Sequence, residues 1–297
     1  MPSGPAYAAL AYICWGLFPL YIKQVAHVPA LEVVVHRSVW SMVFVLALLA
    51  LLGRFGWMRQ VLRQPRVLGV FALSALLLSI NWLLYVWAVN GNRLLDASLG
   101  YFINPLINVL LGYAVLHERP RRWQWVAVAL AAAGVLWLTI AAGQLPWVSL
   151  ALALSFALYG LLRKTAVLGA MEGLALETLL LAPLTVGALG FILWRGDGAF
   201  LTGHSRDDWL LLLGGPLTAI PLLLFAAGAR RVSMSTLGLL QYLGPSIQFV
   251  LGIWLYHEPF SALRGVGFAL IWCGLLVYSG ESLLRYRKAA TATAAPS

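Results

Sequence analysis

Charge is the property that this sequence has least of. Only 10% of its 297 residues are Asp, Glu, Lys or Arg, whereas 62% are hydrophobic. Soluble domains carry roughly 25% charged residues, so a chain of this composition is expected to lie in a lipid bilayer rather than in water. The formal net charge is +10, but no basic run lies beside a soluble fold, and binding to nucleic acid is therefore not expected.

Cysteine and the familiar catalytic motifs are also scarce. Cys14 and Cys273 lie inside apolar runs, which provides neither a disulfide framework nor a metal-binding spacing. The chain has no Gly-x-x-x-x-Gly-Lys-Ser/Thr loop for ATP, no His-Glu-x-x-His and no Gly-x-Ser-x-Gly. These absences disfavour an ATP-driven pump and an intramembrane enzyme, and they predict no cofactor and no metal.

Long apolar segments are what the sequence has in abundance. A membrane-spanning helix needs about 20 apolar residues, and ten segments qualify, although the sixth is short. The first has no convincing cleavage site before Lys23, so we interpret it as a span rather than a signal peptide. Only short connections separate the spans, which leaves no room for a soluble domain. The predicted spans are residues 5–25, 31–52, 68–89, 96–116, 123–141, 147–162, 171–194, 209–228, 235–256 and 263–282.

The basic residues predict the orientation of the chain. Cytoplasmic connections of membrane proteins carry an excess of Lys and Arg. If the N-terminus is cytoplasmic, the inner segments hold most of them, whereas the outer segments hold only Lys23, Arg93, Arg195, Arg206 and Arg264. We therefore expect a multi-pass protein with both termini in the cytoplasm.

The chain repeats its pattern about 140 residues later. Asn104-Pro105-Leu-Ile-Asn108 returns as Gly244-Pro245-Ser-Ile-Gln248, and His117-Glu118 returns as His257-Glu258. Each copy holds five predicted spans, and an odd number of spans forces the two copies into opposite orientations, as in many secondary transporters. We predict a first five-helix repeat over residues 1–142, a second, inverted repeat over 143–284, and a disordered cytoplasmic tail over 285–297.

Four motifs resemble a known family. They are His36-Arg37-Ser-Val-Trp40, Asn81-Trp82-Leu-Leu-Tyr85-Val-Trp87-Ala, Ser98-Leu-Gly-Tyr-Phe-Ile-Asn-Pro105 and Thr236-Leu-Gly-Leu-Leu-Gln241-Tyr242-Leu-Gly-Pro245. Together they resemble RarD-type proteins of the EamA-like family, within the drug/metabolite transporter superfamily. The resemblance covers nearly the whole chain. It implies an all-α membrane protein of two inverted five-helix EamA-type repeats that exports small metabolites or drugs across the bacterial inner (plasma) membrane.

Polar and aromatic residues inside the spans are the candidates for a substrate cavity. Aromatic walls with a few polar groups suit a drug-sized site and also planar or cationic ligands. Pro105 and Pro245 each free a backbone carbonyl one turn earlier and are candidate hinges. The alternative interpretations are hydrogen bonding between helices and an aromatic belt at the membrane surface. The cavity candidates are Trp15, Asn81, Trp82, Tyr85, Tyr101, Asn104, Asn108, Tyr159, Gln241, Tyr242 and Gln248.

Three ionisable residues inside spans are candidates for coupling transport to a gradient. Charges within a membrane usually face the bundle interior and mark function. Arg37 and Glu177 occupy equivalent positions in the two repeats and carry opposite charges, and His36 shares a helix face with Glu32. Each could instead order a helix end: Arg37 can extend its guanidinium to the membrane surface, and Glu32 and His36 can form an interfacial pair.

The function predicted from these features is secondary active transport by alternating access, with export as the direction that the resemblance implies. The partners are a small-molecule substrate, the lipid bilayer and, as the candidate coupling ion, protons. The alternative is a membrane channel or a lipid-handling protein without gradient coupling, although no ring of charge or filter-like loop is present. The substrate, the coupling ion and the oligomeric state stay open, as does the alternative that transport is facilitated rather than driven by a gradient.

Overall fold

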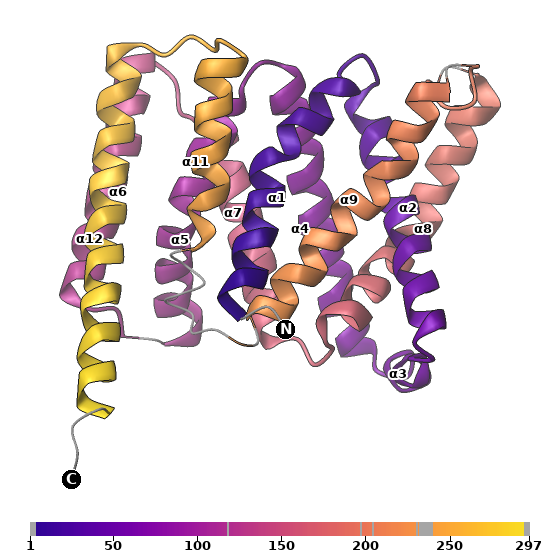
Figure 1. The fold of residues 1–297 in the computed structure, drawn as a ribbon, viewed down its shortest axis with the longest axis horizontal. Helices are drawn as coiled ribbons and strands as arrows, with labels where there is room; N and C mark the ends of the chain where they lie inside the picture. The colour runs from indigo at the N-terminus through magenta and orange to yellow at the C-terminus, as the bar shows by residue number, and fades with distance from the viewer. Residues whose placement is uncertain are drawn as a thin grey trace.

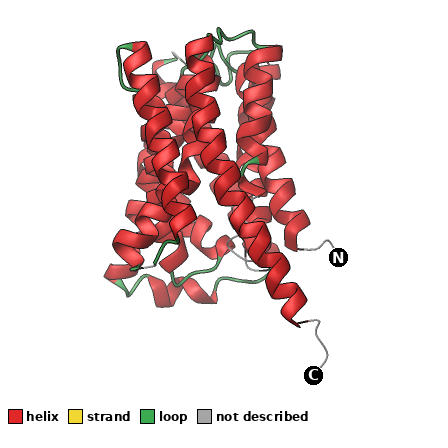
Figure 2. Cartoon of the chain, turned by 90° about the vertical axis from the view of Figure 1, so that its left-hand side faces the viewer, coloured by secondary structure: helices red, strands yellow, loops and turns green. Residues whose placement is uncertain are grey.

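The computed structural model describes residues 4–117, 119–196, 198–203, 205–229, 231 and 240–293. Within these ranges the regular elements are helices that pack side by side in one bundle (Figures 1 and 2). They are α1 (Gly4–Gln24), α2 (Ala30–Leu51), α3 (Gly56–Val61), α4 (Pro65–Asn90), α5 (Leu94–Leu116), α6 (Arg122–Ala142), α7 (Trp147–Thr165), α8 (Ala170–Arg195), α9 (Ser205–Ala229), α11 (Leu243–Val250), the π-helix η1 (Leu251–Leu255) and α12 (Ala262–Thr293).

Eight of these helices are long and apolar enough to cross a membrane. They are α1, α2, α4, α5, α6, α8, α9 and α12, and they coincide with predicted spans to within a few residues except at the end of α12. The sixth and ninth predicted spans appear as the shorter apolar helices Trp147–Arg163 and Leu243–Leu255, and part of the ninth lies outside the described residues. The multi-pass architecture is confirmed, and the count of ten spans stays a prediction.

Two segments differ from the expectation at the level of local structure. The connection predicted over residues 53–67 contains α3, a short helix of six residues. The last helix, α12, continues to Thr293, through most of the segment that we expected to be a disordered tail from residue 285. The alanines at 289, 290 and 292 explain this extension, because alanine has the highest helix propensity of all residues.

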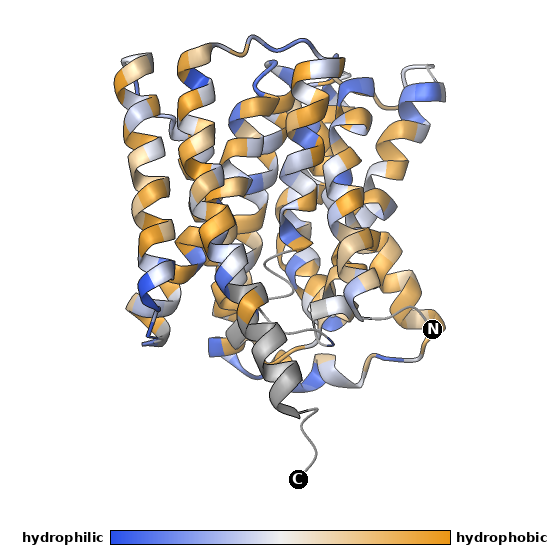
Figure 3. Cartoon of the chain, turned by 60° about the vertical axis from the view of Figure 1, so that its left-hand side comes forward, coloured by the Kyte–Doolittle hydropathy of each residue, from blue (hydrophilic) through white to orange (hydrophobic). Residues whose placement is uncertain are grey.

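The bundle has two distinct ends. The terminal end is the one at which α1 begins and α12 ends, and it also carries α3 (Figure 1). The far end holds the connection from α1 to α2, the one from α8 to α9 and the one from η1 to α12. Hydrophobic residues cover the length of the helices and hydrophilic ones gather toward the ends (Figure 3). Side chains such as Leu184, which is 72% exposed, therefore face lipid.

The main helix contacts join the first half of the chain to the second. Helix α1 packs on α9 and α11, α2 on α8 and α9, α4 and α5 on α7, and α6 on α12. These contacts come in related pairs: shifting by about 140 residues turns the pair α1–α9 into α7–α4 and the pair α1–α11 into α7–α5. This arrangement is the one expected of two inverted repeats.

Glycine allows the closest of these contacts. A Cβ atom on Gly100 of α5 would lie 2.6 Å from the carbonyl oxygen of Ser149 on α7, and one on Gly134 of α6 would lie 2.8 Å from the carbonyl oxygen of Gly267 on α12. Small residues let helix backbones approach in membranes, where the hydrophobic effect does not drive association.

The repeated His-Glu motif lies at helix ends, as the sequence indicates. His117 follows α5 with φ 52°, and His257 follows η1 with φ 50°. The carboxylate of Glu258 accepts hydrogen bonds from the backbone N–H groups of Leu94, at 2.6 Å, and Leu95, at 2.9 Å. It therefore caps the N-terminus of α5, which has otherwise unpaired N–H groups. Glu118 lies outside the described residues.

Candidate functional site

A cavity lies at the centre of the bundle, between the two halves. Its volume is about 80 Å³, and its walls come from α1, α2, α4 and α5 of the first half and from α7, α9 and α11 of the second. Drug-sized sites occupy roughly 300–1,000 Å³, so the cavity in this conformation suits a smaller molecule. We call it the central cavity. It is lined by Tyr12, Trp15, Phe18, Arg37, Leu78, Asn81, Trp82, Tyr85, Tyr101, Phe156, Thr218, Leu222, Gln241, Gly244, Pro245 and Gln248.

Most residues expected to form a substrate cavity lie in this lining, together with Arg37 and Pro245. The cavity candidates found there are Trp15, Asn81, Trp82, Tyr85, Tyr101, Gln241 and Gln248. Asn104, Asn108, Tyr159 and Tyr242 are not among the lining residues, nor are His36 and Glu177.

Asn104 lies behind the wall, where it joins three helical segments. Its side-chain N–H donates to the carbonyl of Ala153 on α7 at 2.9 Å. Its Oδ1 accepts from Gln241 at 2.9 Å and from Asn108 at 3.1 Å. With these bonds made, Asn104 acts between helices, which is the alternative that the sequence left open.

Asn81 lines the cavity, but its amide is also fully engaged. Its N–H₂ donates to the carbonyl of Leu152 at 3.0 Å and to the hydroxyl of Ser155 at 2.9 Å, and its Oδ1 accepts from Tyr101 at 3.2 Å. The residue therefore fixes α4 and α5 against α7. Its role is to hold the wall in place.

Arg37 on α2 is the charged residue of the cavity. Only 4% of its surface is exposed, and its Nε donates to the hydroxyl of Thr218 at 3.0 Å. Its guanidinium carbon lies 4.5 Å from the ring centre of Phe18 and 4.8 Å from that of Trp82. The aromatic wall, which by itself would suit a planar or cationic ligand, thus already holds the guanidinium of the protein. A second cation is therefore disfavoured at these rings.

Glu177 on α8 lies apart from the central cavity, near the terminal end. Its Oε1 accepts from the hydroxyl of Ser74 on α4 at 2.6 Å and lies 3.6 Å from the Nη1 of Arg163 on α7. The side chain is buried, and its Oε2 has no hydrogen-bond partner. A buried carboxylate beside an arginine is an ion pair that a proton or a helix movement can break.

His36, which precedes Arg37 on α2, is also buried. Its Nδ1 accepts from the indole N–H of Trp40 at 3.1 Å, and its ring lies 4.7 Å from that of Phe200. Its Nε2 lies 3.9 Å from Glu32, which is longer than a hydrogen bond. Glu32 instead accepts from the backbone N–H of Ala199 at 2.8 Å. Glu32 thus holds the connection between α8 and α9 at the far end, and it does so without a hydrogen bond to His36.

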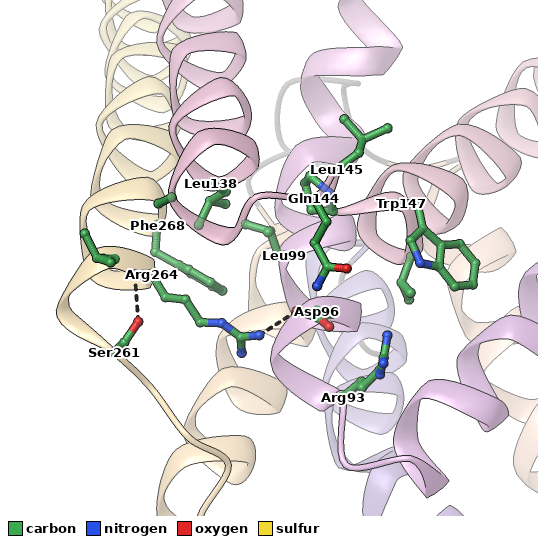
Figure 4. A pocket seen from close by; sticks show the side chains of 14 residues that line it. Arg93, Asp96, Leu99, Leu138, Gln144, Leu145, Trp147, Ser261, Arg264 and Phe268 are labelled. Atoms are coloured by element: carbon green, nitrogen blue, oxygen red, sulfur yellow. Dashed lines mark hydrogen bonds and ion pairs between the residues drawn. The ribbon is translucent and has the colours of Figure 1, made fainter.

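A larger pocket of about 230 Å³ opens at the far end, between α5, α6, α7 and α12 (Figure 4). Arg264 points toward Asp96 there, with 3.8 Å between the Nη2 and Oδ1 atoms. Both side chains are more than a quarter exposed, so the polar atoms of this pair that lack a protein partner can form hydrogen bonds to water. We consider the smaller central cavity the better site because its polar groups are buried and shared between both halves.

Comparison with known proteins identifies the family. Residues 2–140 and residues 145–280 each match the EamA-like transporter family. The chain belongs to this family. The two matches leave residues 141–144 between them, and the boundary after residue 142 stays a prediction.

Relatives of the EamA-like chain extend over nearly its full length. It is 47% identical to a protein named Protein RarD from Streptomyces exfoliatus, over 96% of this chain and 91% of that protein. It is 45% identical to a protein named Uncharacterized transporter YojE from Bacillus subtilis, over 93% of both chains. The chain is thus a RarD-type member and a membrane transporter of the drug/metabolite type, which points away from an enzyme.

A solved crystal structure shares the fold of this EamA-like protein. It superimposes with a TM-score of 0.62 at 22% sequence identity and covers 94% of this chain and 97% of the other. At this identity the likeness concerns the arrangement of the helices alone.

The two candidate hinges differ in their surroundings within the EamA-like bundle. Pro105 lies inside α5, which continues to Leu116. Pro245 lies in α11 and lines the central cavity, and the helix that follows it widens into the π-helix Leu251–Leu255. Wide turns of this kind often occur at functional sites. The second half therefore has an irregularity that the first half lacks at the related position.

Several residues of the cavity lining were not predicted from the sequence, and Phe18, Phe156 and Thr218 are three of them. Phe18 and Phe156 carry no polar group and lie in apolar spans, so nothing separates them from lipid-facing phenylalanines. Thr218 is one of the few polar residues inside its span, and it lies between Pro216 and Pro221. That combination is a signal that could have found it.

Proposed function

We propose that this protein is a secondary active transporter that exports small metabolites across the bacterial inner membrane by alternating access of its two halves. The observation that carries the proposal is the central cavity itself, because both halves contribute to its walls. Rocking one half against the other would open the cavity first to one side of the membrane and then to the other.

In the proposed cycle, the far end is the side that opens outward. Contacts between the two halves hold this end, as the ion pair of Arg54 and Glu172, at 2.6 Å, holds the terminal end. Three of the far-end contacts are the following. The hydroxyl of Tyr21 donates to the carbonyl of Leu210 at 3.0 Å, His27 lies 3.0 Å from Asp207, and the N–H of Ala199 donates to Glu32 at 2.8 Å. Outward opening would have to break them. Substrate would then enter from the terminal end, which we place in the cytoplasm because most basic residues lie in the connections at that end.

A proton gradient is the proposed source of energy, with Glu177 as the residue that carries the proton. Glu177 lies between Ser74 and Arg163, on helices of both halves. Protonation would neutralise the carboxylate and release Arg163, so the charge state of one residue would influence how the halves pack. Glu177→Gln should then retain folding and ligand binding but transport at the same rate with and without a pH gradient. A gradient response equal to that of the unmodified protein would remove Glu177 from the mechanism.

Transport itself can be measured in proteoliposomes. The purified protein would be screened for flux of amino acids, nucleobases, polyamines and amphenicol drugs with an imposed pH gradient. Trp82→Ala, which truncates a cavity wall, is expected to abolish any flux found. Trp194→Ala is the matched control, because Trp194 is 82% exposed on the outside of the bundle. Equal loss in both variants, or flux without saturation as in a channel, would contradict the proposal.

A further inference from the structure

Three polar atoms of the central cavity have no hydrogen-bond partner, although all three are buried. They are Nη1 of Arg37, the hydroxyl of Tyr85 and Oε1 of Gln248. Buried polar groups in proteins are nearly always paired, so each unpaired group calls for an explanation. Seven other buried side-chain atoms of the described residues also lack a partner, but these three belong to residues that line one cavity, where a single ligand could pair with all of them.

Arg37 is also without a counter-charge. No carboxylate of the described residues lies within 4.0 Å of its guanidinium, whereas Glu177, at the equivalent position of the other repeat, has Arg163. Thr218 occupies Nε, and the rings of Phe18 and Trp82 lie against the guanidinium. Aromatic faces offset part of the charge, but they provide no acceptor for Nη1. An isolated charge at this depth is costly and usually has a partner.

We infer that the substrate carries a carboxylate and that Arg37 binds it. This inference rests on the proposed function, since it names the chemistry of the molecule that the cavity would transport. A carboxylate balances the single charge of Arg37 and can accept from a guanidinium N–H and from a second donor at once. The hydroxyl of Tyr85, which has no partner, can serve as the second donor. Oε1 of Gln248 can only accept, so it calls for an N–H or O–H group elsewhere on the same small molecule.

The same atoms disfavour other ligands. A phosphate would bring up to two negative charges and three oxygen acceptors to a cavity with one cation. A cationic amine would meet Arg37 already placed against the aromatic wall, and like charges repel. A neutral amide of the same shape keeps one acceptor oxygen, but it brings no negative charge to balance Arg37, and its N–H₂ group replaces the oxygen that would accept from a second donor. The cavity should therefore distinguish an acid from its own amide.

Matched acids and amides provide the test. The full-length protein in detergent would be heated with benzoate and benzamide, phenylacetate and phenylacetamide, and a set of amino acids and their amides. A ligand that binds the folded state raises the melting temperature. We expect shifts from acids and not from the paired amides, with Kd values at least tenfold lower for the acids. Equal shifts for acids and amides, or no shift from any acid, would overturn the inference.

Variants locate the binding. Arg37→Met should remove the acid-selective shift, and Arg37→Lys, which keeps the charge but not the planar fork, should weaken it. Arg264→Met is the matched control, because it removes an arginine from the far-end pocket and should leave the shift unchanged. If Arg37→Met does not fold, the Lys variant decides: affinity for acids equal to that of the unmodified protein contradicts a role for the guanidinium.

Flux measurements separate this inference from the proposed function. Suppose that a neutral compound is transported and that Arg37→Met transports it at the normal rate. This result would overturn the inference that the substrate carries a carboxylate, but it would support the proposed transport function. An acid that binds through Arg37 but is never transported would support the anion site and contradict transport of the bound molecule.

Discussion

Arg37 and Glu177 occupy the same position in two related halves of the chain, yet their surroundings differ. Both are buried, with 4% and 1% of their surface exposed. Glu177 has Arg163 and Ser74 beside it. Arg37 has Thr218 and two aromatic rings, but its Nη1 finds no acceptor among the described residues. One half thus neutralises its charge internally, and the other leaves its charge available in the central cavity. Two repeats of the same fold can divide the tasks of a transporter in this way.

The largest expected difference between the two residues is in how much the free energy of unfolding falls when each one is replaced by an apolar residue. Glu177→Leu leaves Arg163 without its carboxylate, and breaking a buried pair from one side costs roughly 3–5 kcal/mol; we expect about 3 kcal/mol because Arg163 is partly exposed. Arg37→Met removes a charge that has no counter-charge, so its unfolding free energy should be unchanged or higher. Unfolding by denaturant in mixed micelles measures both. Equal destabilisation of the two variants would contradict the comparison.

A double variant sharpens the first result. Arg163→Met together with Glu177→Leu removes both charges, and replacing a buried pair by apolar residues is often close to neutral. The double variant should recover about 2 kcal/mol relative to Glu177→Leu alone. Strictly additive losses in the same unfolding assay would mean that the 3.6 Å contact does not contribute to stability.

The smallest effect concerns Thr218, which orients Arg37. Thr218→Val removes the acceptor of the Nε hydrogen bond, which is typically worth about 1 kcal/mol. Affinity for a bound acid should fall roughly fivefold, while the preference for acids over amides persists. Thr218→Ser, which keeps the hydroxyl, should restore affinity in a titration of the same acid. If Val and Ser variants bind alike, the hydroxyl does not position the guanidinium.

Hydrophobic runs and a repeated motif were enough to predict the helical bundle, since a span must satisfy its backbone internally and is recognisable by its length. Aromatic and amide residues of the third and ninth spans predicted much of the cavity lining for a similar reason, because few polar groups are tolerated there. The prediction failed where the rotation of a helix decides. Asn104 and Tyr101 are three residues apart on α5, yet the first bonds to Ala153 behind the wall and the second faces the cavity.

The signs of the charges could be predicted, but their partners could not. Nothing in the sequence indicates that Arg163, near the end of α7, reaches Glu177 on the next helix. Nor does it indicate that Thr218 reaches Arg37, which is 181 residues away in the chain. Such contacts depend on how α2, α4, α7, α8 and α9 pack across the two halves.

The cap that Glu258 places on α5 links the far end to the cavity wall. The capped residues, Leu94 and Leu95, begin the helix that carries Tyr101 about two turns further on. A helix of this length moves nearly as a rigid body, so any displacement of the loop between η1 and α12 is transmitted along α5 to the aromatic wall. The volume available to a bound molecule is thereby tied to the position of a loop on the membrane surface, and mutations in that loop would alter selectivity without touching the ligand.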